Sequence, residues 1–327
     1  VEEVFCFDAD KGGAPLWIAE FGDHTGGDYG WGDGPNSTPC IDGDRVYCIN
    51  KFSVMVCLGL TDGKVLWKKF LGGQNHGYSS APMTWENLVI VPGGEKQQLG
   101  AYLKDSGELV WTYGATPTEA ETLCFAAPVL AKIGGQEQIV HHASQHSFGV
   151  EPRTGKLLWE APFKAGGLYC ALVPDGDMVF VPCSLQGIKV QGETATEAWK
   201  KEPKDKAEFF AVGHCEPLVK DGYLCTFTEN DGLCYTGKYP GDMRCLDIKT
   251  GQTKWVEKGT GAAMVLEVDG CLLCLNFSGD LFLVEAKAAK LKSYRTLDEM
   301  RAADVVLSGT PGELLGAEGQ GLPVIEA

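Results

Sequence analysis

Two stretches of the chain decide the fold, LDIKTGQTKW at residues 246–255 and VEPRTGKLLW at residues 150–159. Each combines a short apolar run, a polar turn that contains Thr-Gly, and a second run that ends in Trp. The same pattern, with variations, ends at six Trp residues: Trp17, Trp67, Trp111, Trp159, Trp199 and Trp255. These residues follow one another at intervals of about 48 residues, and such a period is typical of a repeat protein.

The pattern predicts a β-hairpin in each copy. Five copies have a glycine four positions before the Trp: Gly13, Gly63, Gly107, Gly155 and Gly251. Glycine adopts the positive φ that a tight turn requires, and Ala195 takes its place in the remaining copy. Asp-Gly pairs between the copies predict a second hairpin in each repeat. They occur at residues 42–43, 175–176, 221–222 and 269–270.

Two hairpins in each repeat give four short antiparallel strands, which is the signature of a propeller blade. A β-sandwich is the alternative for an all-β chain, but a sandwich does not require a Trp that recurs at a fixed place. We therefore predict an all-β fold, a β-propeller of four-stranded antiparallel blades. Residues 1–327 are predicted to form a single propeller domain.

The D-x-x-T-G-x-x-x-W pattern resembles the Trp-docking repeat of the PQQ-like β-propellers, which include quinoprotein alcohol dehydrogenases and BamB-like proteins. The resemblance covers about residues 4–298. It implies that the six repeated Trp residues pack between neighbouring blades. It also implies eight blades, with an opening blade that is incomplete at the N-terminus and closed by C-terminal strands; seven blades remain possible.

Composition and charge narrow the function classes. Hydrophobic residues make up 44% of the chain, which is ordinary for a globular protein. The formal net charge is −16, and an acidic surface repels phosphates, so we expect no nucleic-acid partner. No apolar run is long enough to span a membrane, and the first ten residues have no signal-peptide pattern. The resemblance implies a periplasmic or secreted bacterial protein, and we expect a monomer.

The chain has 13 cysteines, an odd number that leaves at least one thiol unpaired. Several lie within apolar, strand-like runs, where we expect small buried side chains. These are Cys6, Cys48, Cys57 and Cys225. Cys271 and Cys274 form a CLLC motif, but a strand would point them to opposite faces, which argues against a zinc site. The sequence leaves open which cysteines pair.

The topology of a propeller predicts where a binding site lies. Connections between blades and loops between second and third strands share one face, the top face, near the central channel. The candidate ligand-binding residues on these segments are His24, Tyr29, Trp31, Asp33, His76, Tyr78, Glu95, Lys96, His146, Tyr169, Phe210 and His214. Histidine can act as an acid, a base or a ligand near pH 7, and aromatic rings suit stacking on a sugar or a peptide. Loops also collect polar residues without any functional reason.

No catalytic motif names a reaction class. The chain lacks HExxH, GxSxG and P-loop patterns. Quinoprotein dehydrogenases of the resembled superfamily need a Cys-Cys dipeptide and a calcium site, and neither is evident here. We therefore expect no PQQ, calcium or other metal, and a binding or scaffold protein with a protein or carbohydrate partner at the top face. A carbohydrate-active or other enzyme that uses the channel mouth is the alternative, and a quinone-dependent dehydrogenase is a third.

Overall fold

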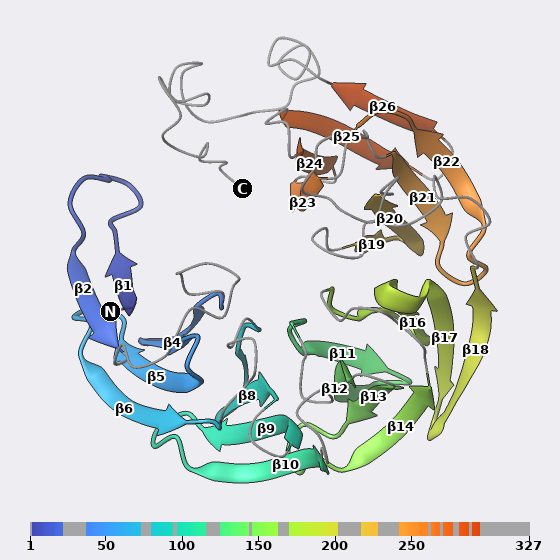
Figure 1. Cartoon of the computed structure of the whole chain (residues 1–327). Coiled ribbons are helices and arrows are strands. Elements are labelled where there is room, and N and C mark those ends of the chain that lie inside the picture. Colours follow the sequence, from blue (N-terminus) through green and yellow to red (C-terminus); the bar gives the residue numbers. More distant parts are fainter. Residues whose placement is uncertain are drawn as a thin grey trace. The chain divides into compact units, whose positions relative to one another are not determined.

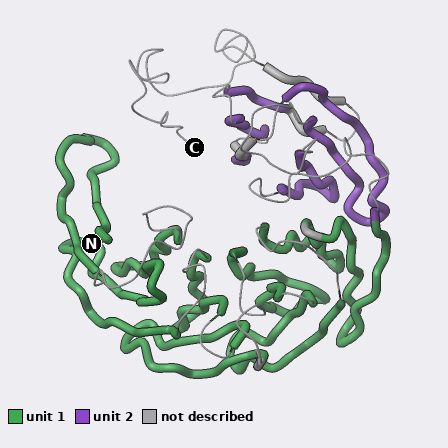
Figure 2. Tube along the Cα trace, in the orientation of Figure 1, with its two compact units in different colours: residues 1–200 green, residues 201–327 purple. Residues whose placement is uncertain are grey.

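The structure is a computed structural model of the whole chain, and its description covers thirteen segments. These are residues 2–21, 37–72, 80–93, 97–115, 125–143, 146–162, 170–201, 217–227, 242–260, 263–268, 271–276, 281–287 and 290–294. The chain divides into two compact units, unit 1 (Val1–Lys200) and unit 2 (Lys201–Ala327), coloured separately in Figure 2. Each unit is described by itself.

Unit 1 begins with a two-stranded sheet and continues with four four-stranded sheets (Figure 1). The first sheet pairs β1 (Glu2–Cys6) with β2 (Trp17–Phe21). The second and third sheets comprise β3 (Cys40–Asp42), β4 (Arg45–Ile49), β5 (Val54–Gly59), β6 (Val65–Phe70), β7 (Met83–Trp85), β8 (Leu88–Pro92), β9 (Gln97–Leu103) and β10 (Leu109–Ala115). The fourth and fifth comprise β11 (Val129–Ile133), β12 (Gln136–Ala143), β13 (His146–Val150), β14 (Leu157–Pro162), β15 (Val173–Asp175), β16 (Met178–Val181), the short 3-10 helix η2 (Pro182–Ser184), β17 (Gln186–Gln191) and β18 (Thr194–Lys200).

Unit 2 contains two further four-stranded sheets. They comprise β19 (Leu218–Lys220), β20 (Tyr223–Phe227), β21 (Met243–Asp247), β22 (Thr253–Glu257), β23 (Ala263–Val268), β24 (Cys271–Asn276), β25 (Leu281–Lys287) and β26 (Lys290–Tyr294). In all six four-stranded sheets the strands are antiparallel and paired in chain order. Each sheet therefore has one end with the turn between third and fourth strands, the turn end, and an opposite end where the second strand stops and the third begins, the loop end.

Clusters of buried apolar side chains lie between successive sheets of unit 1. In β5, Met55 and Cys57 pack with Val89 and Val91 of the next sheet, in one cluster. Val56 belongs to a second cluster, on the other side of the sheet, which includes Ala19, Phe21 and Leu58. Since both faces of the sheet are covered, the middle strands are continuous apolar runs rather than alternating ones.

The repeated Trp and Gly residues meet across neighbouring sheets. The indole N–H of Trp17 donates to the carbonyl of Leu60 over 2.8 Å, and a Cβ on Gly63 would lie 2.5 Å from the Trp17 ring. Trp67 repeats this arrangement on the next turn, with a 2.8 Å bond to the carbonyl of Lys104. Glycine is therefore required in these turns for two reasons, a positive φ of 66° at Gly63 and the Trp that covers it.

Trp159 departs from this arrangement. Its indole N–H donates to Oε1 of Gln138 in its own sheet over 2.7 Å, and the ring covers Gly149 in the adjacent strand β13. Trp199 departs in the same way, since its ring covers Gly187 in its own sheet. In the sheet that follows Trp159, β17 ends at Gln191 and β18 begins at Thr194. This turn is shorter than the turns of Gly63 and Gly107, which receive Trp17 and Trp67.

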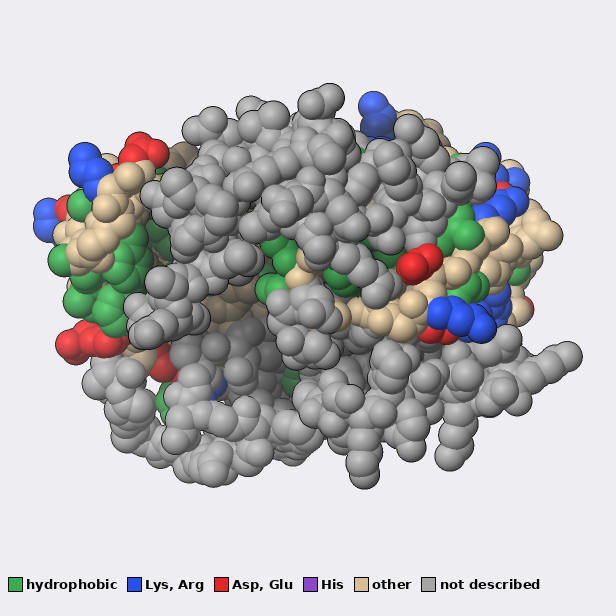
Figure 3. All heavy atoms as spheres, turned by 90° about the horizontal axis from the view of Figure 1, so that it is seen from above, with side chains coloured by type: hydrophobic (Ala, Val, Ile, Leu, Met, Phe, Trp, Pro, Cys, Tyr) green, Lys and Arg blue, Asp and Glu red, His purple; other side chains and the backbone are tan. Residues whose placement is uncertain are grey.

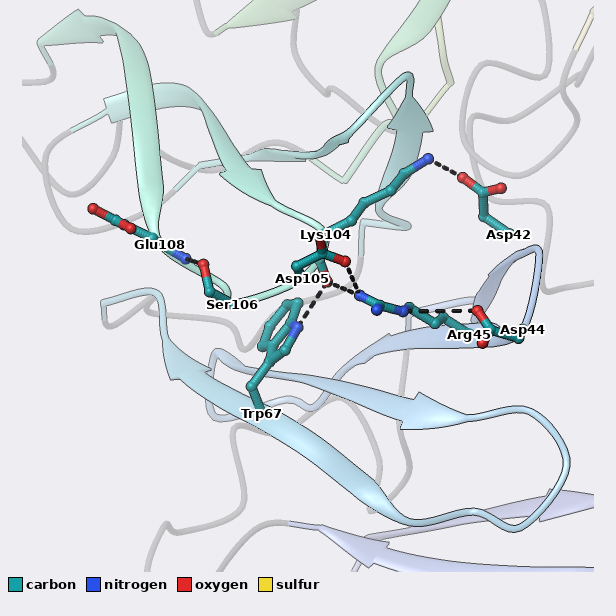
Figure 4. Close-up of polar contacts among 8 residues, drawn as sticks. All are labelled: Asp42, Asp44, Arg45, Trp67, Lys104, Asp105, Ser106 and Glu108. Atoms are coloured by element: carbon teal, nitrogen blue, oxygen red, sulfur yellow. Dashed lines mark hydrogen bonds and ion pairs between the residues drawn. The ribbon is translucent and has the colours of Figure 1, made fainter.

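A polar network fastens the turn end of the β3–β6 sheet to the next sheet (Figure 4). The carbonyl of Lys104 accepts hydrogen bonds from Trp67 and from Nη1 of Arg45, the latter over 2.7 Å. Nη1 of Arg45 also lies 2.7 Å from Oδ1 of Asp105, and the ammonium of Lys104 pairs with Asp42. The guanidinium therefore holds the hairpin of one sheet against the turn of the next.

Replacement of Arg45 tests this network. We expect Arg45→Ala to lower the free energy of unfolding by about 1 kcal/mol, because a partly buried charged donor is lost from a carbonyl. Urea unfolding followed by Trp fluorescence measures the change. Lys11→Ala is the matched control, since Lys11 pairs with Asp8 on an exposed turn and such pairs contribute little. Equal losses in the two variants would contradict a special role for Arg45.

Candidate functional site

Most of the candidate ligand-binding residues lie outside the described residues. His24, Tyr29, Trp31, Asp33, His76, Tyr78, Glu95, Lys96, Tyr169, Phe210 and His214 belong to this group. His146 is described, as the first residue of β13, half-buried at the loop end of its sheet. The predicted site therefore stays a prediction. The loop ends are the part of this region that the structure describes.

Buried polar side chains gather at the loop ends. They include Asn50, Ser53, His141, His142, Ser147, Ser184, Gln186, Thr226 and Asn276. Glu2, Ser80 and Thr260 are also buried and lie beside strand ends on the same side. Among the described residues Gln138 is a buried polar side chain nearer the other end, and it is bonded to Trp159. Burying polar groups is costly, so their concentration at one end distinguishes that end from the apolar middle of each sheet.

Some of these side chains connect the loop ends of successive sheets. The hydroxyl of Ser37 donates to the carbonyl of Ser80 over 2.9 Å, and the hydroxyl of Ser80 donates to the carbonyl of Ala126 over 2.6 Å. Each of these residues lies three positions before the first strand of its sheet. The sequence signal is a Ser-x-Pro motif at residues 37–39 and 80–82, which our sequence reasoning missed.

Histidine and aromatic side chains form a second group, at the loop end of the β11–β14 sheet. The ring centroids of His141 and His146 lie 5.8 and 5.7 Å from that of Phe148. Tyr113, from the preceding sheet, lies 4.5 Å from the same ring. Among the described residues, neither ring nitrogen of His141 has a hydrogen-bond partner. His141 was not selected from the sequence because it lies inside the apolar run of β12.

Burial keeps both strand histidines neutral at pH 7. Desolvation lowers the pKa of His141 well below its ordinary value, and the neighbouring His142 adds to this effect. Desolvation also lowers the pKa of His142 to about 4, against a backbone hydrogen bond at Cys170 that favours the charged form. A histidine of this kind cannot serve as a general acid near pH 7.

Burial also makes two thiols of the β3–β6 sheet hard to ionise. Desolvation raises the pKa of the Cys48 thiol to about 12 and that of Cys57 to about 11. Within the described segments no three His, Cys, Asp or Glu side chains are placed to hold a metal ion. Acidic and basic side chains are interspersed on the face seen in Figure 3. Apart from Glu2, the buried polar side chains at the described loop ends are neutral at pH 7.

The sequence pattern and the sheets match a known family. The family described as outer membrane protein assembly factor BamB matches residues 2–168. The chain belongs to the BamB family. Among solved structures, BamB from Moraxella catarrhalis is similar, with 12% identity, a TM-score of 0.60, and coverage of 90% of this chain and 80% of that chain. A computationally designed protein, Ika8, is similar with 13% identity, a TM-score of 0.50, and coverage of 76% and 70%. No curated protein matches the chain.

Membership of the BamB family and the four-stranded sheets confirm two predictions. The chain is a BamB-like repeat protein, and its fold class is an all-β propeller of four-stranded antiparallel blades. The number of blades, the closure by C-terminal strands and the single domain stay predictions, since residues 295–327 lie outside the description. No described helix has the length and apolar character to cross a membrane.

Proposed function

We propose that this protein is a binding or scaffold propeller that holds a protein partner at its loop ends, without bound PQQ. Two observations support the proposal: membership of the BamB family, described as an assembly factor for outer membrane proteins, and the gathering of buried polar side chains at the loop ends. By analogy with that description, we propose a monomer that works in the periplasm or at the outer membrane.

Buried side chains at the loop ends hydrogen-bond to the backbone of nearby loops, and these bonds support the proposal. Asn50 accepts hydrogen bonds from the backbone N–H groups of Phe52 and Val54, over 3.1 and 2.8 Å, and so shapes the loop between β4 and β5. Asn276 donates to the carbonyl of Thr260 over 2.9 Å in unit 2. Side chains that fix loop backbones in this way pre-organise a surface, which reduces the entropy lost on binding a partner.

Site-specific photo-crosslinking tests the proposal. A photoreactive residue is placed at His146, at Lys51 or, as the control, at Lys64 on the exposed turn that contains Asp62. In cells we expect a discrete protein adduct at His146 or Lys51 and none at Lys64. Adducts at Lys64 alone, or equal adducts at all three positions, would contradict a loop-end partner. Titration calorimetry with PQQ and calcium should give no binding heat.

A carbohydrate-active protein is the second candidate. It is motivated by the aromatic residues that the sequence predicts at the top face, such as Tyr29, Trp31 and Tyr78. Aromatic rings offer flat apolar surfaces against which sugar rings stack. Binding of soluble oligosaccharides that is lost in Trp31→Ala, with no protein adduct at His146, would favour this candidate.

A further inference from the structure

Two cysteines of unit 2 lie directly opposite each other in neighbouring strands. Cys225 of β20 pairs with Cys245 of β21 in the antiparallel register. Residues opposite each other in such a pair have Cα atoms about 4.5 or 5.5 Å apart, depending on the hydrogen-bond pattern. Both values fall within the span of about 4.4–6.8 Å that a disulfide bridges. The ladder therefore places the two Cα atoms at a suitable distance without any movement of the backbone.

The two thiols also point to the same face and touch. Both side chains are buried in the apolar cluster that includes Leu272 and Phe282. The thiol of Cys225 donates a hydrogen bond to the sulfur of Cys245. This hydrogen bond, together with burial, raises the pKa of Cys225. The same bond lowers the pKa of Cys245, and the ammonium of Lys254 adds to this effect.

The other cysteines of the described strand ladders lie opposite residues of other types. Cys6 lies opposite Trp17, Cys48 opposite Val56, and Cys271 opposite Val268. Cys40 and Cys57 share a face, but Tyr47 lies between them in the ladder. Two strand spacings separate their backbones by about 9.5 Å, which is beyond the reach of a disulfide. Cys274 shares the core of the Cys225 pair but lies in the neighbouring sheet, opposite Val265.

We propose that Cys225 and Cys245 form a cross-strand disulfide when the protein folds in the presence of a disulfide oxidant, such as oxidised glutathione or a thiol–disulfide oxidoreductase. The Cys245 thiolate attacks the disulfide of the oxidant, which gives a mixed disulfide and releases one thiol. Cys225 then loses its proton and displaces the second thiol of the oxidant. The two protein thiols are oxidised to one disulfide, and the disulfide of the oxidant is reduced to two thiols.

The bond would link the strands on either side of the loop between β20 and β21. It closes a ring of about 20 residues, and such a ring restricts the unfolded chain. Since the thiols are buried, oxidation is expected during folding or on local opening, and the finished bond is shielded from reductants. This adds a covalent clamp at the middle of the β20–β21 ladder, independently of whether the proposed protein partner exists.

Peptide mapping of the full chain tests the proposal. The protein is refolded in a glutathione redox buffer, free thiols are alkylated, and the chain is digested with trypsin without reduction. We expect the peptide of residues 245–249 to be linked to that of residues 221–238. The second peptide also contains Cys234, so the link must persist in Cys234→Ser and in Cys274→Ser, and disappear in Cys225→Ser and Cys245→Ser.

If a serine variant fails to fold, the wild-type protein still decides the question. Fragment spectra of its linked peptide show which two cysteines form the disulfide. We expect the thermal midpoint of oxidised wild-type protein to fall by roughly 5 °C on reduction. Alkylation of both Cys225 and Cys245 in the refolded, oxidised protein would overturn the proposal. A link that persists in Cys225→Ser would overturn it as well.

Discussion

Trp111→Ala is expected to lower the free energy of unfolding by about 3–5 kcal/mol, the range for removing a large aromatic side chain from a core. Trp111 is only 8% exposed and packs in the cluster that contains Ile139 and Phe148 of the next sheet. Its indole N–H donates to the carbonyl of Pro152 over 3.1 Å, and its ring covers Gly155. Urea unfolding of the full chain, followed by circular dichroism, measures the loss.

Trp85→Ala is the matched control, because Trp85 belongs to the same sheet and also contacts the next one. Its indole N–H donates to Glu137 over 3.2 Å, and the guanidinium of Arg153 lies 5.2 Å from the ring. Trp85 is half-buried and packs only against the edge of the cluster that contains Trp111, so we expect a smaller loss of about 1–2 kcal/mol. Equal losses of stability in the two variants would contradict the special contribution that we assign to Trp111, its burial against the turn of the next sheet.

The strands and turns were predictable because their signals are local. A glycine four residues before a Trp indicates a turn at that glycine. Asp221-Gly222 has the pair of positive φ angles that is expected from an Asp-Gly turn. The partner of each Trp was not predictable from its own copy. Trp159 follows a regular Thr-Gly turn in its own copy, yet its indole N–H donates to Gln138 of its own sheet.

The candidate site was less predictable, because connections between blades have no period of their own. Chain order places His24 and Tyr78 near the loop ends but gives no contact for either. In addition, the candidates were sought on loops, whereas some of the buried polar side chains at the loop ends lie within strands. His141 and Ser147 occupy positions where the apolar pattern of a middle strand predicts a hydrocarbon side chain. A polar residue within an apolar middle strand was therefore the sequence feature that could have identified these positions.

Acid is expected to destabilise unit 1 well above the range in which carboxylates titrate. The native pKa of His142 is about 4, against an ordinary value of 6.5, so the unfolded chain binds the proton first as pH falls. Stability is constant above pH 6.5 and declines from there to about pH 4, by about 3 kcal/mol for this residue. His141 acts in the same direction. Urea unfolding at pH values from 7.5 to 4.5 measures the decline.

His141→Leu separates this effect from general acid denaturation. Since neither ring nitrogen of His141 bonds to another described residue, an apolar replacement should preserve stability at pH 7.5. It should also reduce the slope between pH 6 and 5 by up to one proton, about 1.4 kcal/mol per pH unit. Ser147→Ala, which removes a buried hydroxyl that does not titrate in this range, should keep the wild-type slope. The pKa values of Asp42 and Asp62 are lowered by Lys104 and Lys64 respectively. Their contributions to the free energy of unfolding are therefore lost only below the pH range of this test. An unchanged slope in His141→Leu would therefore show that this buried imidazole is not the group that makes unit 1 sensitive to acid.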